Sequence, residues 1–142
     1  MKEKVIKLIL SVLEGEFNHI GISRPDLYCI PTFYQKNGNF WVAIENDKII
    51  GTVGIFCNSS RQGFIMRMCV DSSYRGTGVA QKLLSTLIDF AKQNHYKEIF
   101  LSTSANMIAA QKFYNKEGFE IVDTLPREFT AIGDSIFYKM TL

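Results

Sequence analysis

A short glycine-containing turn, Arg75-Gly76-Thr77-Gly78, joins two patterned segments of the chain. An apolar run ends at Val70 before the turn, and from Val79 onward apolar residues recur at helical spacing. A strand that enters a helix in this way leaves several backbone N–H groups without acceptors in the first helical turn. Those donors and the helix dipole attract a phosphate, the glycines let a ligand approach the backbone, and Arg75 adds a permanent cation. The pattern therefore predicts a turn that holds a diphosphate.

Two other phosphate-binding motifs fit this turn less well. The dinucleotide fingerprint G-x-G-x-x-G requires a third glycine where the chain has Gln81, and it follows a βαβ opening instead of an antiparallel meander. A Walker loop needs a Gly-Lys-Ser/Thr sequence that this turn lacks. The structural alternative is a strand–helix turn in which glycine only relieves backbone strain.

Length and composition are those of an ordinary globular domain. The 142 residues suffice for one domain with its own core, and 46% apolar with 21% charged residues is typical of soluble proteins. A net charge of +2 is too small to indicate a nucleic-acid or membrane partner. Cys29, Cys57 and Cys69 form no C-x-x-C pair, so we expect a reduced, cytoplasmic protein without a metal. Lys7 interrupts the N-terminal apolar run, which argues against a signal peptide, and no segment is long enough to span a bilayer.

Hydrophobic periodicity predicts the elements that position the turn. We expect turn chemistry at Asn37-Gly38-Asn39 and at Asn46-Asp47, a helix cap at Asn106 and a helix stop at Gly118. The order of elements predicts one α/β domain over residues 1–142 with a mixed sheet. The predicted elements are a helix over 2–17, a mixed segment over 21–39, an antiparallel meander of strands over 40–45, 48–57 and 64–70, a helix over 79–94, a strand over 99–102, a helix after 106, and strands over 119–122 and 135–142.

Two segments carry a family resemblance: Val70–Ala80, which contains the glycine turn, and Asn106–Phe119 downstream of it. The first resembles motif A of the GCN5-related N-acetyltransferases (GNAT), with its Arg/Gln-x-x-Gly-x-Gly/Ala pattern. The second is similar to that family's Asn…Ala…Phe-Tyr…Gly-Phe segment. Two motifs in the right order are more specific than either one, and the likeness covers residues 40–122 well. The family usually begins with a strand, whereas this chain is predicted to begin with a helix.

The resemblance implies a fold and a ligand. The fold is a mixed, mostly antiparallel central sheet flanked by helices, in which the parallel strands 64–70 and 99–102 splay apart around coenzyme A. The pantetheine arm would pair with the backbone of one strand like an added strand, the pyrophosphate would bind the turn, and Asn106 would hydrogen-bond the pantetheine or phosphate region. The cofactor-binding residues that the resemblance implies are Met68, Cys69, Val70, Arg75, Gly76, Thr77, Gly78, Val79, Ala80, Gln81 and Asn106.

The resemblance also implies an N-acetyltransferase that moves an acetyl group from acetyl-CoA to a primary amine of a small molecule, amino acid or peptide terminus, by direct attack and without a covalent enzyme intermediate. Tyr114 would face the thioester sulfur as the general-acid candidate. Its phenol has a pKa of about 10 against about 8.5 for a thiol, so we expect a hydrogen bond to the leaving thiolate with concerted or late proton transfer. The alternative is that Tyr114 only packs beside Phe113.

Several assignments stay open at this level. We interpret Cys69 as a small apolar residue of its strand, and we expect the segments 28–36 and 123–134 to set acceptor specificity. A second hypothesis is a non-catalytic acyl-CoA-binding sensor or interaction module, and a third is a nucleotide-binding enzyme. Dimers are common in the similar family, and the C-terminal strand is a candidate contact. The carboxylates considered as general base are Glu14, Glu16, Glu45 and Asp71.

Overall fold

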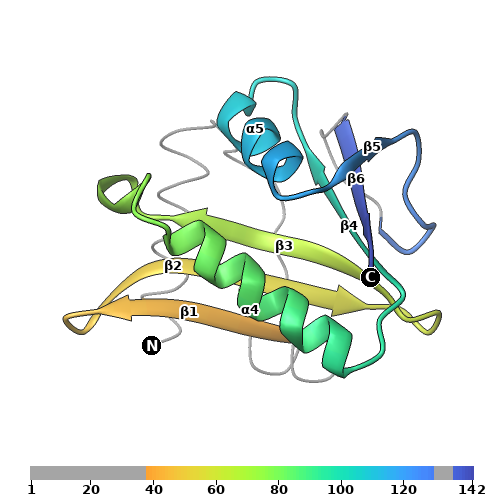
Figure 1. Ribbon diagram of the computed structural model, residues 1–142, viewed down its shortest axis with the longest axis horizontal. Helices are drawn as coiled ribbons and strands as arrows, with labels where there is room; N and C mark the ends of the chain where they lie inside the picture. Colours follow the sequence, from red (N-terminus) through yellow and green to blue (C-terminus); the bar gives the residue numbers. More distant parts are fainter. Residues whose placement is uncertain (1–37, 130–135) are drawn as a thin grey trace.

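The structure is a computed structural model and describes residues 38–129 and 136–142. The predicted helix over 2–17, most of the segment 21–39, Cys29, Glu14 and Glu16 lie outside these residues. Six strands form one sheet in the order β1-β2-β3-β4-β6-β5, and α4 and α5 lie on the same face of it (Figure 1). The predicted mixed, mostly antiparallel α/β fold is confirmed. The elements are β1 Gly38–Glu45, β2 Lys48–Cys57, β3 Gln62–Val70, the 3-10 helix η1 Ser72–Tyr74, α4 Val79–Gln93, β4 Glu98–Thr103, α5 Ile108–Lys116, β5 Glu120–Val122 and β6 Ile136–Thr141.

The meander β1–β2–β3 forms as predicted, with one correction at its start. Asn46 and Asp47 turn the first hairpin with φ values of 50° and 62°, a left-handed backbone that Asn and Asp tolerate. The turn predicted at Asn37-Gly38-Asn39 is wrong for its last two residues, because Gly38 and Asn39 already belong to β1. A Cβ on Gly38 would lie 1.7 Å from the carbonyl oxygen of Ile55. Glycine therefore allows the close approach of two strands at this position.

The helix α4 covers β1, β2 and β3 with its apolar side. Its buried residues recur at helical spacing and pack in one core cluster with Val53 and Ile55 of β2, which explains why the predicted helix over 79–94 is confirmed within one residue. The buried residues of α4 are Leu83, Leu84, Leu87 and Ala91.

The helix α5 starts differently from the prediction. Its N-cap is Met107 and no side chain caps it, so the cap predicted at Asn106 is wrong. Asn106 Oδ1 instead accepts a hydrogen bond from the Ser104 hydroxyl at 2.7 Å, which removes it from the helix end. Gly118 follows the C-cap with a φ of 98° and ends the helix as predicted.

The opposite face of the sheet carries a second, aromatic cluster. Phe64 of β3 and Phe100 of β4 point away from the α4 side and pack with Phe129, whose ring stacks on Phe64 at a centroid distance of 5.1 Å. Phe129 is buried, so the described part of the segment 123–134 is anchored to the sheet by an aromatic side chain. The C-terminal strand β6 pairs with β4 on one edge and with β5 on the other, so a dimer contact by edge pairing is closed along Phe137–Lys139.

Candidate active site

The parallel strands β3 and β4 separate after three ladder pairs. Gln62, Gly63 and Phe64 pair with Glu98, Ile99 and Phe100, and the ladder ends there although both strands continue. The antiparallel ladder between β2 and β3 shifts register at the same level, since Gly54 pairs with Met66 but Thr52 pairs with Cys69. Two residues of β3 thus oppose one residue of β2, which is a β-bulge. A bulge bends its strand, and this one lies where β3 parts from β4.

The bulge has an anchor on the neighbouring strand. Thr52 is fully buried, and its hydroxyl donates a 2.8 Å hydrogen bond to the carbonyl oxygen of Arg67. Arg67 has a φ of 56°, a left-handed conformation that is unfavourable for a residue with a long side chain. Such strain persists only where surrounding contacts hold it, and the hydrogen bond from Thr52 is one of them.

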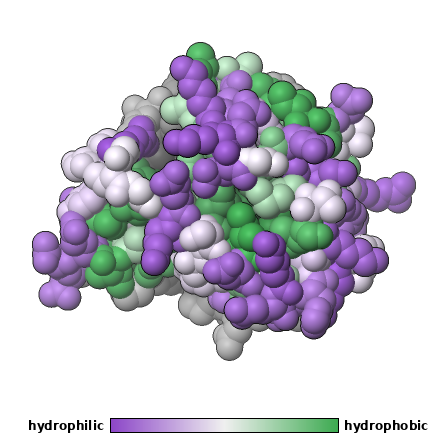
Figure 2. Space-filling view, in the orientation of Figure 1, coloured by the Kyte–Doolittle hydropathy of each residue, from purple (hydrophilic) through white to green (hydrophobic). Residues whose placement is uncertain are grey.

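Beyond the bulge, the predicted residues Met68, Cys69 and Val70 form one wall of the opening. Cys69 is 3% exposed, whereas Met68 and Val70 are half-buried against the core under α4. In the view of Figure 2, hydrophobic residues gather in a band between the hydrophilic surfaces of α4 and α5. An apolar floor with a strand edge beside it suits an extended arm that carries amide groups.

The glycine turn has the geometry of an anion cradle. Gly76 and Gly78 have φ values of 76° and 91°, and a Cβ added at either would meet no atom within 4 Å. The space next to both glycines is therefore open among the described residues. Lys82 N–H bonds to Gly78 O at 3.0 Å, and the N–H groups of the preceding residues 79–81 have no acceptor inside the helix. These are the donors that the sequence predicts for a diphosphate.

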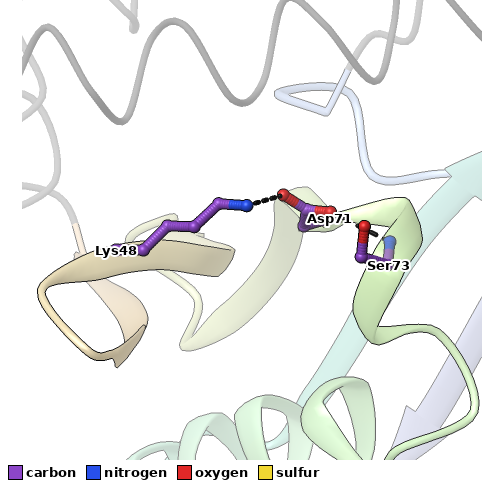
Figure 3. Close-up of polar contacts among 3 residues, drawn as sticks. All are labelled: Lys48, Asp71 and Ser73. Carbon is purple, nitrogen blue, oxygen red and sulfur yellow. Dashed lines mark hydrogen bonds and ion pairs between the residues drawn. The ribbon is translucent and has the colours of Figure 1, made fainter.

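Residues next to the turn hold it in place. Asp71 Oδ1 accepts the backbone N–H of Ser73 at 2.9 Å, and Asp71 Oδ2 lies 3.2 Å from Lys48 Nζ (Figure 3). The hydrogen bond from the Ser73 N–H has the largest effect and lowers the pKa of Asp71 below its ordinary value; burial opposes it, and Lys48 lowers the pKa further. Lys48 also lies 5.9 Å from the centre of the Tyr74 ring. The β1–β2 hairpin thus supports the turn from the side, and Asp71, a candidate base, is engaged in that support.

Arg75 folds back along the turn, with Nη2 3.5 Å from the carbonyl oxygen of Val70. Thr77 likewise bonds through its hydroxyl to the carbonyl of Tyr74. Both side chains are exposed, and their short local bonds add to the support that Lys48 and Asp71 give the turn.

Tyr114 comes from α5 and lies in the core beneath it. It is 6% exposed and its ring contacts those of Phe113, Phe119 and Tyr138 at centroid distances of 5.2, 5.5 and 6.2 Å. Burial, and to a lesser degree the nearby Cys69, raises the pKa of Tyr114 well above that of a free phenol. Tyr114 belongs to the core cluster against which Met68 and Val70 pack, so the fold brings α5 over the predicted part of β3. Tyr114 is therefore a neutral hydrogen-bond donor at any ordinary pH.

The loop that leads into α5 holds Asn106 at an exposed position. The Gln111 side chain secures this loop by donating to the carbonyls of Ser104 and Ala105, each at 3.1 Å. Sequence reasoning missed Gln111, Thr52 and Lys48. A glutamine one turn into a helix is a weak signal for such a bond, and nothing in the local sequence marks the other two.

The described ranges contain neither a candidate metal site nor a candidate membrane-spanning helix. Within residues 38–129 and 136–142, no group of three or more His, Cys, Asp and Glu side chains could hold a metal ion. Among the helices of those ranges, none has the length and apolar character needed to cross a membrane.

Comparison with known proteins identifies the family. The sequence model described as the acetyltransferase (GNAT) family matches residues 8–119. The chain belongs to this family. A GNAT-family acetyltransferase from Staphylococcus aureus Mu50 is similar in structure, with a TM-score of 0.93 and 36% identity over 99% of this chain and 92% of that one. The resemblance in the two motifs is thus confirmed at the level of family and fold.

Two further relatives of this GNAT chain bear on its chemistry. A putative streptothricin acetyltransferase from Bacillus anthracis, solved in complex with acetyl coenzyme A, shares 28% identity and a TM-score of 0.63 over 77% of this chain and 68% of its own. N-acetylaspartate synthetase of Xenopus tropicalis is 39% identical over 119 residues, which is 82% of this chain. The chain spans less than half the length of that curated relative, 42%.

Proposed function

We propose that this protein is an acetyl-CoA-dependent N-acetyltransferase that acts on a primary amine. The observation that carries the proposal is the opening between β3 and β4: the glycine turn at the end of β3 has open space at both glycines, and Tyr114 of α5 belongs to the core cluster against which Met68 and Val70 pack. Membership of the GNAT family and the acetyl coenzyme A complex of the Bacillus anthracis relative support the same assignment.

The chain's own groups fit the parts of the co-substrate. The N–H groups at the start of α4 would bind the linked phosphates, with Arg75 beside them as a cation. The backbone of Met68, Cys69 and Val70 would pair with the pantetheine amides as a strand edge does with an extended peptide. Asn106 would bond to the pantetheine or phosphate region. With these contacts the thioester would lie near the bulge.

Acetyl transfer then needs three things from the site. The acceptor ammonium must lose its proton, because an amine with a pKa of about 10.4 is neutral in only about one molecule in 2,500 at pH 7. The neutral nitrogen attacks the thioester carbon, and a backbone N–H near Cys69 and Val70 would bond to the oxyanion, a contribution of about 3 kcal/mol. As the carbon–sulfur bond breaks, the nitrogen of the adduct releases its second proton to solvent, and Tyr114 would donate a hydrogen bond to the departing thiolate.

The raised pKa of Tyr114 decides how it would act. A phenol that holds its proton so tightly stabilises the thiolate by hydrogen bonding, and the proton moves late or comes from solvent. We assign no base to the acceptor. Asp71 is paired with Lys48, and Glu45 lies close enough to Tyr74 to raise the pKa of that phenol, so both described candidates are engaged elsewhere.

The acceptor we propose is an amino acid or another small molecule or peptide with a free amine. The Xenopus tropicalis relative is named for the acetylation product of aspartate, so L-aspartate is the first acceptor to test. A cytoplasmic location and a homodimer belong to the same proposal, and cell fractionation and light scattering of the purified protein test them.

A thiol-release assay with acetyl-CoA and a panel of amines tests the function. A thermal-shift series with CoA, ATP and NAD accompanies it, because a ligand at 100 times its Kd adds about 2.7 kcal/mol to folding stability. Stabilisation by CoA with amine-dependent thiol release is the expected result. Stabilisation by CoA without release for any amine would favour the acyl-CoA sensor, and stabilisation by ATP or NAD alone would contradict the proposal.

A further inference from the structure

Thr103, the last residue of β4, has a buried hydroxyl group without a hydrogen-bond partner. The residue is 3% exposed, and among residues 38–129 and 136–142 its Oγ1 is the one buried side-chain nitrogen or oxygen found without a partner. Burying a hydroxyl in this way is unfavourable, and native proteins rarely leave one unsatisfied. Thr52, the other buried threonine of the described sheet, bonds to a carbonyl oxygen. The exception at Thr103 therefore asks for an explanation.

The position of Thr103 on its strand places it at the opening. Side chains alternate along β4, and Ile99 and Leu101 belong to the core cluster that also contains Leu84 and Tyr114. Thr103 accordingly presents its side chain to the same face of the sheet as α4 and α5. The ladder to β3 ends at Phe100, so Thr103 lies three residues into the separated part of the strand.

The opposite wall of the opening is the edge of β3 beyond the bulge. Met68 and Val70 pack partly buried against the same core cluster as Leu101, so they face the same side of the sheet as Thr103. On its other edge Thr103 pairs with Ile136 of β6, which leaves the opening as the side of β4 that has no strand neighbour at this level among the described residues. A hydroxyl on one wall and a strand edge on the other form a polar pair across an apolar floor.

We propose that Thr103 is a cofactor-binding residue whose hydroxyl hydrogen-bonds an amide of the pantetheine arm, and this rests on the proposed function. A secondary amide offers both a carbonyl acceptor and an N–H donor, and a hydroxyl can rotate to meet either. The edge of β3 can bond to one side of an extended arm, and Thr103 would bond from the opposite wall. Cofactor binding would thus give a partner to the one unsatisfied buried hydroxyl of the described core. Without the cofactor, burial of that hydroxyl is unfavourable.

Substitution of Thr103 by valine and by serine tests this assignment. Thr103→Val keeps the shape and removes the hydroxyl, whereas Thr103→Ser keeps the hydroxyl. Calorimetric titration is performed with CoA and with adenosine 3′,5′-bisphosphate, which lacks the pantetheine arm. We expect the valine variant to bind CoA about 3- to 10-fold more weakly, as for loss of one neutral hydrogen bond, with serine within about twofold of the wild type. The affinity for the bisphosphate should stay unchanged in both.

Urea unfolding without ligand gives a second, opposite signature. Since the valine side chain removes an unsatisfied buried group, the unliganded Thr103→Val protein should unfold at an equal or higher urea concentration than the wild type. Weaker CoA binding together with equal or greater stability is the expected combination. A valine variant that binds CoA as tightly as the wild type, or that loses affinity for the bisphosphate equally, would overturn the assignment.

Two measurements separate this inference from the function on which it rests. A wild-type protein that does not bind CoA would overturn the proposed function, whereas wild-type binding with an unaffected valine variant overturns Thr103 alone. A CoA analogue with methylene groups in place of the pantetheine amides lacks both the carbonyl acceptor and the N–H donor, and it should lose affinity for the wild type but lose less for the valine variant. Equal losses of affinity in the two proteins would overturn the assignment of Thr103. If the valine variant does not fold, a wild-type protein that binds the analogue as tightly as CoA would also overturn it.

Discussion

Thr52 donates a hydrogen bond of 2.8 Å to the carbonyl oxygen of Arg67, on the neighbouring strand and fifteen residues away in sequence. This contact holds the residue whose left-handed backbone forms the bulge in β3. We predict that Thr52→Val lowers the free energy of unfolding by about 1–3 kcal/mol, because it leaves the half-buried Arg67 carbonyl with one partner fewer. It should also weaken CoA binding, because the β3 edge would no longer be held in its bent position. Urea unfolding and CoA titration measure the two effects.

Thr52→Ser is the matched control for that prediction, since it keeps the hydroxyl and should keep most of the CoA affinity. A Thr52→Val protein with reduced stability but full CoA affinity would show that the bulge does not depend on this bond.

The glycine turn can be tested against a second glycine of similar backbone. Gly78 and Gly118 have φ values of 91° and 98°, and a Cβ added at Gly78 would meet no atom within 4 Å, whereas one at Gly118 would lie 3.8 Å from Met140 Cε. Alanine at either position should therefore cost about 1–2 kcal/mol of stability through backbone strain. We expect only Gly78→Ala to weaken CoA binding strongly, because only that methyl group projects into the turn. Equal CoA affinity of the two variants would contradict a phosphate site there.

The carboxylate of Asp71 predicts a pH dependence of the turn. Its pKa is lowered in the folded protein, so its stabilising effect is present above the unfolded pKa of about 3.9 and is lost as the pH falls through the lower folded value. Stability measured between about pH 5 and pH 2 should fall less steeply in Asp71→Asn than in the wild type. The asparagine can still accept the Ser73 N–H, so near pH 7 CoA binding should weaken less in Asp71→Asn than in Asp71→Ala.

Lys48→Met provides the complementary variant for the ion pair. Because Lys48 is largely exposed, its loss should change stability by less than about 1 kcal/mol and the change should shrink in high salt. A steep acid dependence that persists in Asp71→Asn would assign it to another carboxyl group.

Tyr114→Phe tests the role of the phenol. We expect kcat to fall about 10- to 100-fold with the Kd for CoA little changed, because the hydroxyl would act on the departing sulfur and contribute little to binding. The pKa of Tyr114 is raised by burial, so ionisation of this group should not lower activity between about pH 8 and pH 10. Rates measured across that pH range with saturating acceptor show whether activity falls as the pH rises.

Tyr138→Phe is the control for Tyr114, since Tyr138 is a buried tyrosine whose ring contacts that of Tyr114 at 6.2 Å. Removal of its hydroxyl should leave kcat close to that of the wild type. A Tyr114→Phe enzyme with full turnover would mean that the ring only packs, as its contacts with Phe113 and Phe119 already allow.

The amino-acid sequence by itself determined the strands, the helices of the described region and the glycine turn. Each of these follows from a pattern within a few neighbouring residues: a mostly apolar run after the Asn46-Asp47 turn for β2, helical spacing for α4, and two closely spaced glycines, Gly76 and Gly78, for the turn. The two motifs also identified the family. Local patterns suffice there, because backbone hydrogen bonding in a helix or turn depends on residues close in the chain.

The tertiary structure alone decided how β3 and β4 part and what surrounds the site. The bulge at Arg67 depends on Thr52, the support of Asp71 depends on Lys48, and the orphan hydroxyl of Thr103 depends on where a ladder ends. The first two are contacts between residues far apart in sequence. The third is a missing hydrogen-bond partner, at a point where β4 has separated from β3. Asn106 is a further example: its side-chain oxygen accepts a hydrogen bond from Ser104 and does not cap the N-terminus of α5. Such competition between partners is settled only when the chain has folded.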